Sequence, residues 1–209
     1  MQEANEPSVA YLTAAEHAAK DVAIPEALIY EMVNGKPIYY RGWREVLKNE
    51  KTIEQVMASS YIQSFLINEI AFVLNKDGLR KNYIILTNEA GLKFKKGDWR
   101  AADIALLLKS VMKGIKLHNH YVEQKPSIII EVDTKADADN LAAYYKDKTK
   151  HLHNEGIQKV IWVFTETEQI MVAEPDKHWE IFDWSETVEV VEGVGFNVAE
   201  LIADFNEQV

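Results

Sequence analysis

Residues 127–164 read SIIIEVDTKADADNLAAYYKDKTKHLHNEGIQKVIWVF, and this stretch decides the expected fold. Residues 127–132 form a continuous apolar run interrupted only by Glu131, and residues 160–164 form a second apolar run. Such runs are typical of strands buried on both faces. The segment between them has helical spacing and predicts a helix over residues 137–155. A strand, a helix and a strand in this order predict a right-handed crossover joining two parallel strands.

The flanking segments extend this unit into a larger sheet. Asn34-Gly35 separates two strand-like runs and is a strong signal for a β-hairpin. Helical spacing over residues 59–74 predicts another helix. Further strands are expected at 83–87, 92–95, 100–108, 170–173, 179–182 and 188–191, and a last helix at 198–205. These elements predict an α/β domain over residues 23–209, with a mixed sheet, an N-terminal hairpin and a strand-rich C-terminal tail. Residues 1–22 are expected to form an N-terminal helical extension.

Composition limits the classes of function. The chain has 209 residues, with 23 Lys and Arg against 33 Asp and Glu, and a formal net charge of −10. This charge argues against a protein that coats nucleic acid, because neutralising phosphates requires basic residues. The chain has no cysteine, which excludes disulfides, thiolate nucleophiles and Cys-ligated zinc. No apolar run is long enough to span a bilayer, so we expect a cytoplasmic protein without a membrane partner.

Lys148 occupies an unusual place on the expected helix. On a helical wheel it falls on the apolar stripe formed by Leu141, Tyr145 and Leu152. Lysine is almost never buried without a partner. Lys148 therefore either extends its ammonium out from under the helix to solvent or faces a carboxylate or phosphate at the sheet.

Glu131 is the natural partner for Lys148. It interrupts a buried strand, where an ionised carboxylate is costly unless it is paired or binds a metal. Asp133 is expected on the same face, because the side chains of a strand alternate. An ion pair between Glu131 and Lys148 that has no further role stays open as an alternative.

Two further acids extend the pattern. Glu69 is expected at the centre of the apolar stripe of helix 59–74, where it would act as a supporting acid or lie at a helix edge. Asp103 lies near the start of strand 100–108, a place where Asp is also an ordinary turn residue. Two carboxylates on neighbouring strands can hold Mg²⁺, which prefers oxygen ligands and keeps water and substrate phosphate in its other positions. A nearby lysine can stabilise developing negative charge, so the set suits phosphodiester hydrolysis.

Several short motifs follow one another along the chain, namely Tyr30-Glu31, Asn34-Gly35, Asp103, Glu131-Val132-Asp133-Thr134, Lys148, Gly156-Ile157 and Gly195-Phe196. Their order and spacing resemble the PD-(D/E)XK nuclease superfamily and, within it, the Uma-type family of restriction endonuclease-like domains found in bacteria. The resemblance covers about residues 24–205. It implies a restriction-endonuclease-like fold, in which helices flank a mixed β-sheet core.

The resemblance also implies a set of site residues. Asp103 and Glu131 would be the metal ligands, and Lys148 the catalytic lysine. The supporting acids would be Glu31, Glu69 and Asp133. The chain departs from the family at two positions near the site: Ala102 replaces the proline before the aspartate, and Asp133 replaces the lysine of the Glu-x-Lys motif. Activity would therefore depend on Lys148, on the following helix. Trp162 is displaced by one position from the family's tryptophan, which affects packing rather than chemistry.

The resemblance predicts an endonuclease that uses Mg²⁺ or Mn²⁺ to hydrolyse DNA. DNA would be a partner that is held weakly without the metal, and a homodimer is possible in principle because two strands are cut. Two alternatives remain: a catalytically silent interaction module with the same fold, and a metal hydrolase acting on small phosphorylated substrates. A local basic rim could hold DNA despite the net charge, and its candidates are Lys93, Lys95, Lys96, Arg100, Lys109, Lys113 and Lys116. His118 and His120 could form a metal pair, although a solvated loop is the favoured interpretation.

Overall fold

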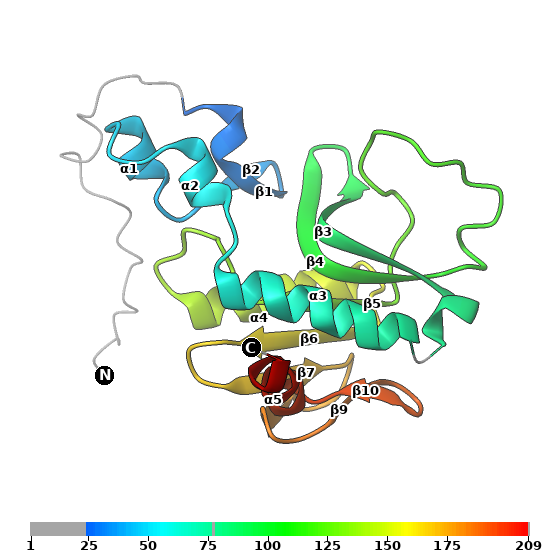
Figure 1. The fold of residues 1–209 in the computed structure, drawn as a ribbon. Coiled ribbons are helices and arrows are strands. Elements are labelled where there is room, and N and C mark those ends of the chain that lie inside the picture. The colour runs from blue at the N-terminus through cyan, green and yellow to red at the C-terminus, as the bar shows by residue number, and fades with distance from the viewer. Residues whose placement is uncertain (1–23, 77, 209) are drawn as a thin grey trace, which may run out of the picture.

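The computed structural model describes residues 24–76 and 78–208 (Figure 1). The predicted extension over residues 1–22 lies outside the described residues. The helices are α1 (Trp43–Leu47), α2 (Ile53–Met57), α3 (Tyr61–Lys76), α4 (Leu141–Asn154) and α5 (Val198–Gln208), with 3-10 turns η2 (Glu26–Leu28) and η3 (Leu79–Lys81). The strands are β1 (Ile29–Val33), β2 (Lys36–Tyr39), β3 (Tyr83–Lys95), β4 (Asp98–Leu108), β5 (Ile128–Val132), β6 (Lys159–Phe164), β7 (Gln169–Ala173), β8 (Glu180–Asp183), β9 (Val188–Val191) and β10 (Val194–Phe196).

One mixed sheet organises the described residues. Its strand order is β2-β1-β4-β5-β6-β7-β8, and β3 pairs with β4 beside this path. β5 and β6 are parallel, with Glu131 opposite Trp162, while the other pairs in this sheet are antiparallel. The predicted strand-helix-strand unit with parallel strands is therefore confirmed, as is the α/β class with a mixed sheet flanked by helices.

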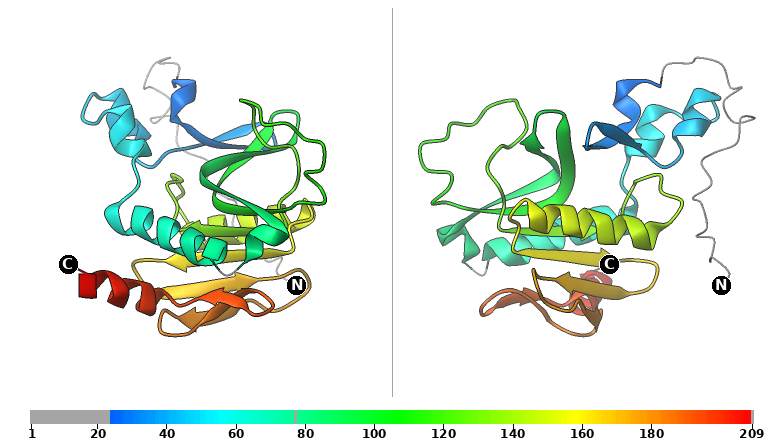
Figure 2. Two further views of the ribbon diagram at one scale, coloured as in Figure 1. Left: turned by 45° about the vertical axis from the view of Figure 1, so that its right-hand side comes forward. Right: turned by 180° about the vertical axis from the view of Figure 1, so that it is seen from behind.

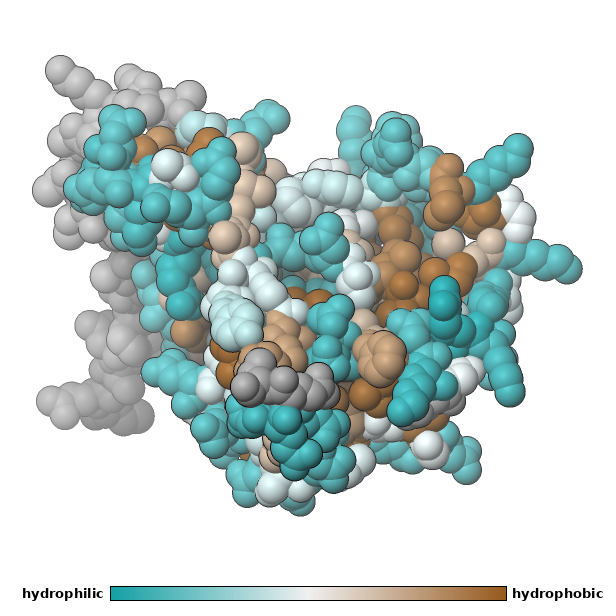
Figure 3. Space-filling view, viewed as in Figure 1, coloured by the Kyte–Doolittle hydropathy of each residue, from teal (hydrophilic) through white to brown (hydrophobic). Residues whose placement is uncertain are grey.

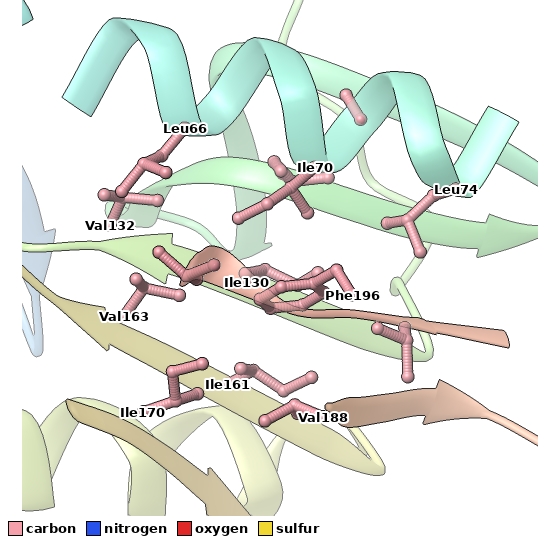
Figure 4. Close-up of a cluster of buried hydrophobic side chains, with 14 of the residues drawn as sticks. Leu66, Ile70, Leu74, Ile130, Val132, Ile161, Val163, Ile170, Val188 and Phe196 are labelled. Carbon is pink, nitrogen blue, oxygen red and sulfur yellow. The ribbon is translucent and has the colours of Figure 1, made fainter. Parts of the chain in front are cut away.

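Helices cover both faces of the central strands. α3 lies along one face, where Leu66, Ile70 and Leu74 point toward Ile130 and Ile161 (Figure 4). α4 lies along the opposite face, as the view from behind makes plain (Figure 2). Because helices cover both faces of β5 and β6, the side chains on both faces of these strands are buried, which explains their continuous apolar runs. Among the described residues, no helix combines the length and the apolar character needed to cross a membrane.

β3 differs from its expected form. Residues 83–95 form one long strand rather than two strands joined by a turn, and its pairing with β4 shifts between Thr87 and Ala90. Asn88 and Glu89 have φ angles of 69° and 51°, so the expected turn is a bulge within the strand. A bulge absorbs extra residues while the partner strand continues unbroken.

α4 begins later than expected, at Leu141 rather than near residue 137. Asn140 is the N-cap, and its side chain accepts a hydrogen bond from Ala143 N. The preceding segment is held instead against the N-terminal hairpin, where Asp137 N donates to Tyr39 O at 2.8 Å. This contact joins residues separated by nearly half the length of the chain, so helical periodicity could not reveal it.

Candidate functional site

Lys148 lies at the centre of a buried group of charges. Its side chain is 1% exposed, and its Nζ lies 2.8 Å from Glu31 Oε1 and 2.9 Å from Glu131 Oε1. The ammonium also donates a hydrogen bond to Ala101 O at 3.0 Å. The predicted inward orientation of Lys148 is thus confirmed, and the alternative in which it reaches solvent is wrong.

Glu31 joins this group from β1. Its Oε2 accepts hydrogen bonds from Arg100 Nη1 at 2.6 Å and from the Tyr144 hydroxyl at 2.9 Å. Arg100 is 3% exposed, and its Nε donates to His151 Nδ1 at 2.8 Å. Arg100 was expected in the basic rim, and its burial against Glu31 corrects that expectation. Two cations and two carboxylates therefore balance inside the fold.

The surroundings shift the protonation of these groups in different directions. Burial raises the pKa of Glu131 above its ordinary value, and the adjacent Lys148 ammonium opposes this effect. Burial also acts to raise the pKa of Glu31, but the nearby Lys148 and Arg100 outweigh it and lower that pKa below its ordinary value. Burial alone would lower the pKa of Lys148, yet Glu131 and Glu31 hold it well above its ordinary value. Lys148 is therefore a permanent cation between two acids.

Asp103 lies where β4 and β5 stop pairing. The last pair in the register is Ile104 with Ile130, so Asp103 is the next residue along and falls opposite Glu131. Asp103 Oδ2 accepts a hydrogen bond from Val132 N at 2.7 Å. The carboxylate thus takes the place of a backbone carbonyl as the next acceptor beyond the paired part of β4 and β5. Burial raises the pKa of Asp103 to about 6, against the opposing effect of this hydrogen bond.

Asp103 also opens on a cavity of about 440 Å³. The cavity is lined by residues of α3, of the segment that joins α2 to α3, and of the bulge of β3. Its polar lining includes Ser64, Asn68, Glu89 and Lys135. Of the predicted site residues, Asp103 is the one that reaches this cavity.

Glu89 and Lys135 were not identified from the sequence. Glu89 lies on the bulge of β3, and its carboxylate forms an ion pair with Lys135 Nζ. Lys135 also donates to Met57 O at 2.8 Å, so it links β3 to the end of α2 in the lining of the cavity. Glu89 raises the pKa of Asp103 and Lys135 lowers it, although both effects are smaller than that of burial. The position of Glu89 depends on the bulge, for which the alternation of the sequence gave no signal.

Asp133 and Glu69 lie apart from the charged group. Asp133 follows β5 at a φ of 56°, outside the alternation of the strand, and its carboxylate accepts from Thr165 N at 2.9 Å and Thr165 Oγ1 at 2.6 Å. Glu69 is half-buried rather than central on α3, and Asn68 donates to it at 2.9 Å. The buried positions of α3 include Leu66 and Ile70 instead, so the wheel placed Glu69 too close to the core.

The residues present fit a divalent metal held by few protein ligands. Within residues 24–76 and 78–208, no group of three or more His, Asp or Glu side chains is placed to hold a metal ion, and His118 and His120 add no such group. Asp103 and Glu131 face each other across the strands and offer oxygen donors. The buried Glu131 Oε1 receives no directed hydrogen bond among the described residues. Mg²⁺ tolerates such a site, because water and substrate phosphate complete its coordination.

Comparisons with known proteins agree with this architecture. No curated protein matches the sequence. The fold is similar to a crystal structure from Anabaena variabilis ATCC 29413, described as "a putative nuclease belonging to DUF820", with a TM-score of 0.62 and 15% identity over 83% of this chain and 89% of that chain. The model of the Uma2 family, described as "Putative restriction endonuclease", matches residues 49–201. The chain therefore belongs to the Uma2 family of restriction endonuclease-like proteins.

Proposed function

We propose that this protein is a Mg²⁺- or Mn²⁺-dependent endonuclease that hydrolyses phosphodiester bonds in DNA. The observation that carries the proposal is the buried pair of Glu131 and Lys148, with Asp103 opposite Glu131 where β4 and β5 stop pairing. A buried lysine between two carboxylates, beside an acid that opens on a cavity, provides the three groups that such hydrolysis needs.

Each residue has a distinct role in this proposal. Asp103 and Glu131 would hold the metal ion, which when bound supplies Lewis acidity and offsets negative charge on the phosphate. Lys148 would place a fixed positive charge beside the reacting phosphate and stabilise the charge that develops on its oxygens. Glu31 would position Lys148, because it holds the ammonium at 2.8 Å and is itself held by Arg100.

A catalytically silent interaction module is the second candidate. Lys148 and Glu131 are each 1% exposed and lie 2.9 Å apart, as expected for an ion pair with a purely structural role. In that case Asp103 and Glu89 would be acids on the cavity wall without a catalytic role. The silent module predicts no specific binding of divalent metal.

Plasmid cleavage separates the two candidates. The protein is incubated with supercoiled plasmid or single-stranded DNA in Mg²⁺, Mn²⁺ or EDTA, beside the variants Asp103→Asn and Glu131→Gln. We expect metal-dependent nicking that falls at least about 100-fold in both variants. The matched control is Asp204→Asn, the same chemical change at an exposed position of α5, and it should cleave like the unaltered protein.

Equal cleavage by the unaltered protein and Asp103→Asn would show that the activity belongs to a contaminant. Absence of cleavage, together with no heat of Mg²⁺ binding in calorimetry, would favour the silent module over the nuclease.

A further inference from the structure

The segment between β4 and β5 has a charge opposite to that of the whole chain. Residues 109–122 read KSVMKGIKLHNHYV, with three lysines, two histidines and no acid, in a chain whose formal net charge is −10. Loops of this length without regular structure are uncommon in compact domains and are usually functional. The segment therefore needs an explanation beyond connecting two strands.

Its lysines differ from Lys93 and Lys95, two other members of the expected basic rim. Lys93 forms an ion pair with Glu123 at 2.6 Å, and Lys95 with Asp98 at 3.2 Å. Among the described residues, the three lysines of the segment form no ion pair; they are Lys109, Lys113 and Lys116. Their charge is available to an anionic partner.

Apolar side chains alternate with these lysines and are also exposed. Leu117 is 102% exposed, Val111 48% and Ile115 43%. Hydrophobic and hydrophilic residues lie side by side in the upper right of Figure 3, where the segment runs in Figure 1. Exposed apolar residues gathered in one place mark interaction sites.

The segment is held at both ends rather than hanging free. At its start, Lys109 N donates to Asn82 O at 2.8 Å, and at its end Val122 N donates to Gly91 O at 2.9 Å. The ring of Tyr121 packs over Gly91, where an added Cβ would lie 2.5 Å from the ring, and its centroid is 5.2 Å from that of Trp99. The segment therefore projects from the pair of strands β3 and β4 that carries Asp103.

We propose that residues 109–121, here named the basic loop, bind nucleic acid. Lys109, Lys113 and Lys116 would contact phosphates, and Leu117 would press as an apolar wedge against a base step, as apolar side chains do in proteins that bend DNA. Charge complementarity selects this partner, because the loop is cationic and free of acids although the whole chain is acidic. Asn119 and the two histidines add hydrogen-bonding groups suited to phosphates and base edges. The choice of DNA as the nucleic acid rests on the proposed function.

Fluorescence anisotropy with a labelled 20-base-pair duplex tests the lysines, in EDTA so that no cleavage occurs. We expect Lys113→Ala/Lys116→Ala to weaken binding at least about 10-fold and to reduce the slope of log affinity against log salt by roughly 2, since each phosphate contact contributes about 0.9. The matched control is Lys146→Ala/Lys150→Ala, which removes two exposed lysines from α4 and should leave both quantities unchanged. Equal losses in the two double variants, or no binding by the unaltered protein, would overturn the proposal.

A duplex containing 2-aminopurine tests the wedge, because the fluorescence of this base rises when it loses its stacking partner. Leu117→Ala should abolish the rise while keeping the salt slope of the unaltered protein. A rise that is equal in both proteins would refute the role of Leu117. Binding of anionic phospholipid vesicles, but not DNA, that is lost in the lysine double variant would instead assign the loop to a membrane surface and overturn the proposal.

The inference and the proposed function fail separately. DNA binding that depends on the basic loop, without metal-dependent cleavage, would refute the nuclease and keep the loop assignment. Metal-dependent cleavage of DNA, with DNA binding that does not depend on the basic loop, would keep the nuclease and refute the loop assignment.

Discussion

Replacing Asp103 with Asn removes a buried carboxylate while keeping an oxygen that can accept the hydrogen bond from Val132 N. Burial raises the pKa of Asp103 from an ordinary value of 3.8 to about 6. The folded protein therefore binds a proton at this carboxyl more tightly than the unfolded chain does. Ionised Asp103 lowers the free energy of unfolding, and Asp103→Asn should raise it at neutral pH.

The size of this effect follows from the shift in pKa. A change of one pKa unit corresponds to about 1.4 kcal/mol, so the shift at Asp103 corresponds to roughly 3 kcal/mol. Well below pH 3.8 the carboxyl is protonated in both states and the effect vanishes. It grows as the pH rises and is complete above about pH 6. We therefore expect Asp103→Asn to be more stable by up to about 3 kcal/mol at pH 7, and by less than about 1 kcal/mol at pH 4.

Urea denaturation in EDTA, repeated between pH 4 and pH 8, measures the difference. The matched control is Asp204→Asn, whose exposed carboxyl should give a small difference at every pH. In the proposed nuclease, adding Mg²⁺ should stabilise the unaltered protein and leave Asp103→Asn unchanged, because a ligand that binds the folded state raises its stability.

A difference between Asp103→Asn and the unaltered protein that stays constant from pH 4 to pH 7 would refute this reasoning. Such a result would mean that the ionised carboxylate is not penalised by its surroundings. A variant that is less stable at every pH would mean that the hydrogen bond to Val132 outweighs burial.

Two further substitutions test the packing around the site. Lys148→Ala should lower the free energy of unfolding by about 3–5 kcal/mol at pH 7, because it leaves two buried carboxylates without their shared cation. Urea denaturation at pH 7 and pH 5 should show a smaller loss of stability at the lower pH. A loss of stability that is equal at both pH values would contradict the role of charge. Gly91→Ala would place a Cβ 2.5 Å from the Tyr121 ring, so we expect a loss of about 1–3 kcal/mol and a change in tryptophan fluorescence as the ring moves from Trp99. Unchanged stability and fluorescence would show that the ring gives way freely.

The central part of the fold could be predicted because its signals are local. The apolar runs of β5 and β6 and the helix between them follow from neighbouring residues, and they suffice for a parallel pair. The inward direction of Lys148 is also a local property, since a helical wheel depends on residues within two turns. Glu131 could be chosen as its partner because a buried acid and a buried lysine need each other.

The remaining features depend on contacts between distant parts of the chain. The sequence alone suggests that Arg100 is a surface charge, because its partner Glu31 lies 69 residues earlier in the chain. In the structure, Arg100 Nη1 lies 2.6 Å from Glu31 Oε2. Glu89 faces the cavity because of the bulge in β3, and alternation along a strand predicts no bulge. Asp133 lies one residue past the end of β5, where a φ of 56° breaks the alternation that had placed it beside Glu131.

The neutral group of buried charges links four elements that are remote in sequence. Arg100 and Lys148 come from β4 and α4, and Glu31 and Glu131 come from β1 and β5. Losing any one of them alone leaves an unbalanced charge in the interior, whereas losing a cation and an acid together restores neutrality. Viable substitutions at these positions should therefore arise in pairs, and an apolar replacement of Arg100 should be accompanied by one at Glu31. The N-terminal hairpin and the central sheet are thus bound to change together during divergence, although 69 residues separate their paired side chains.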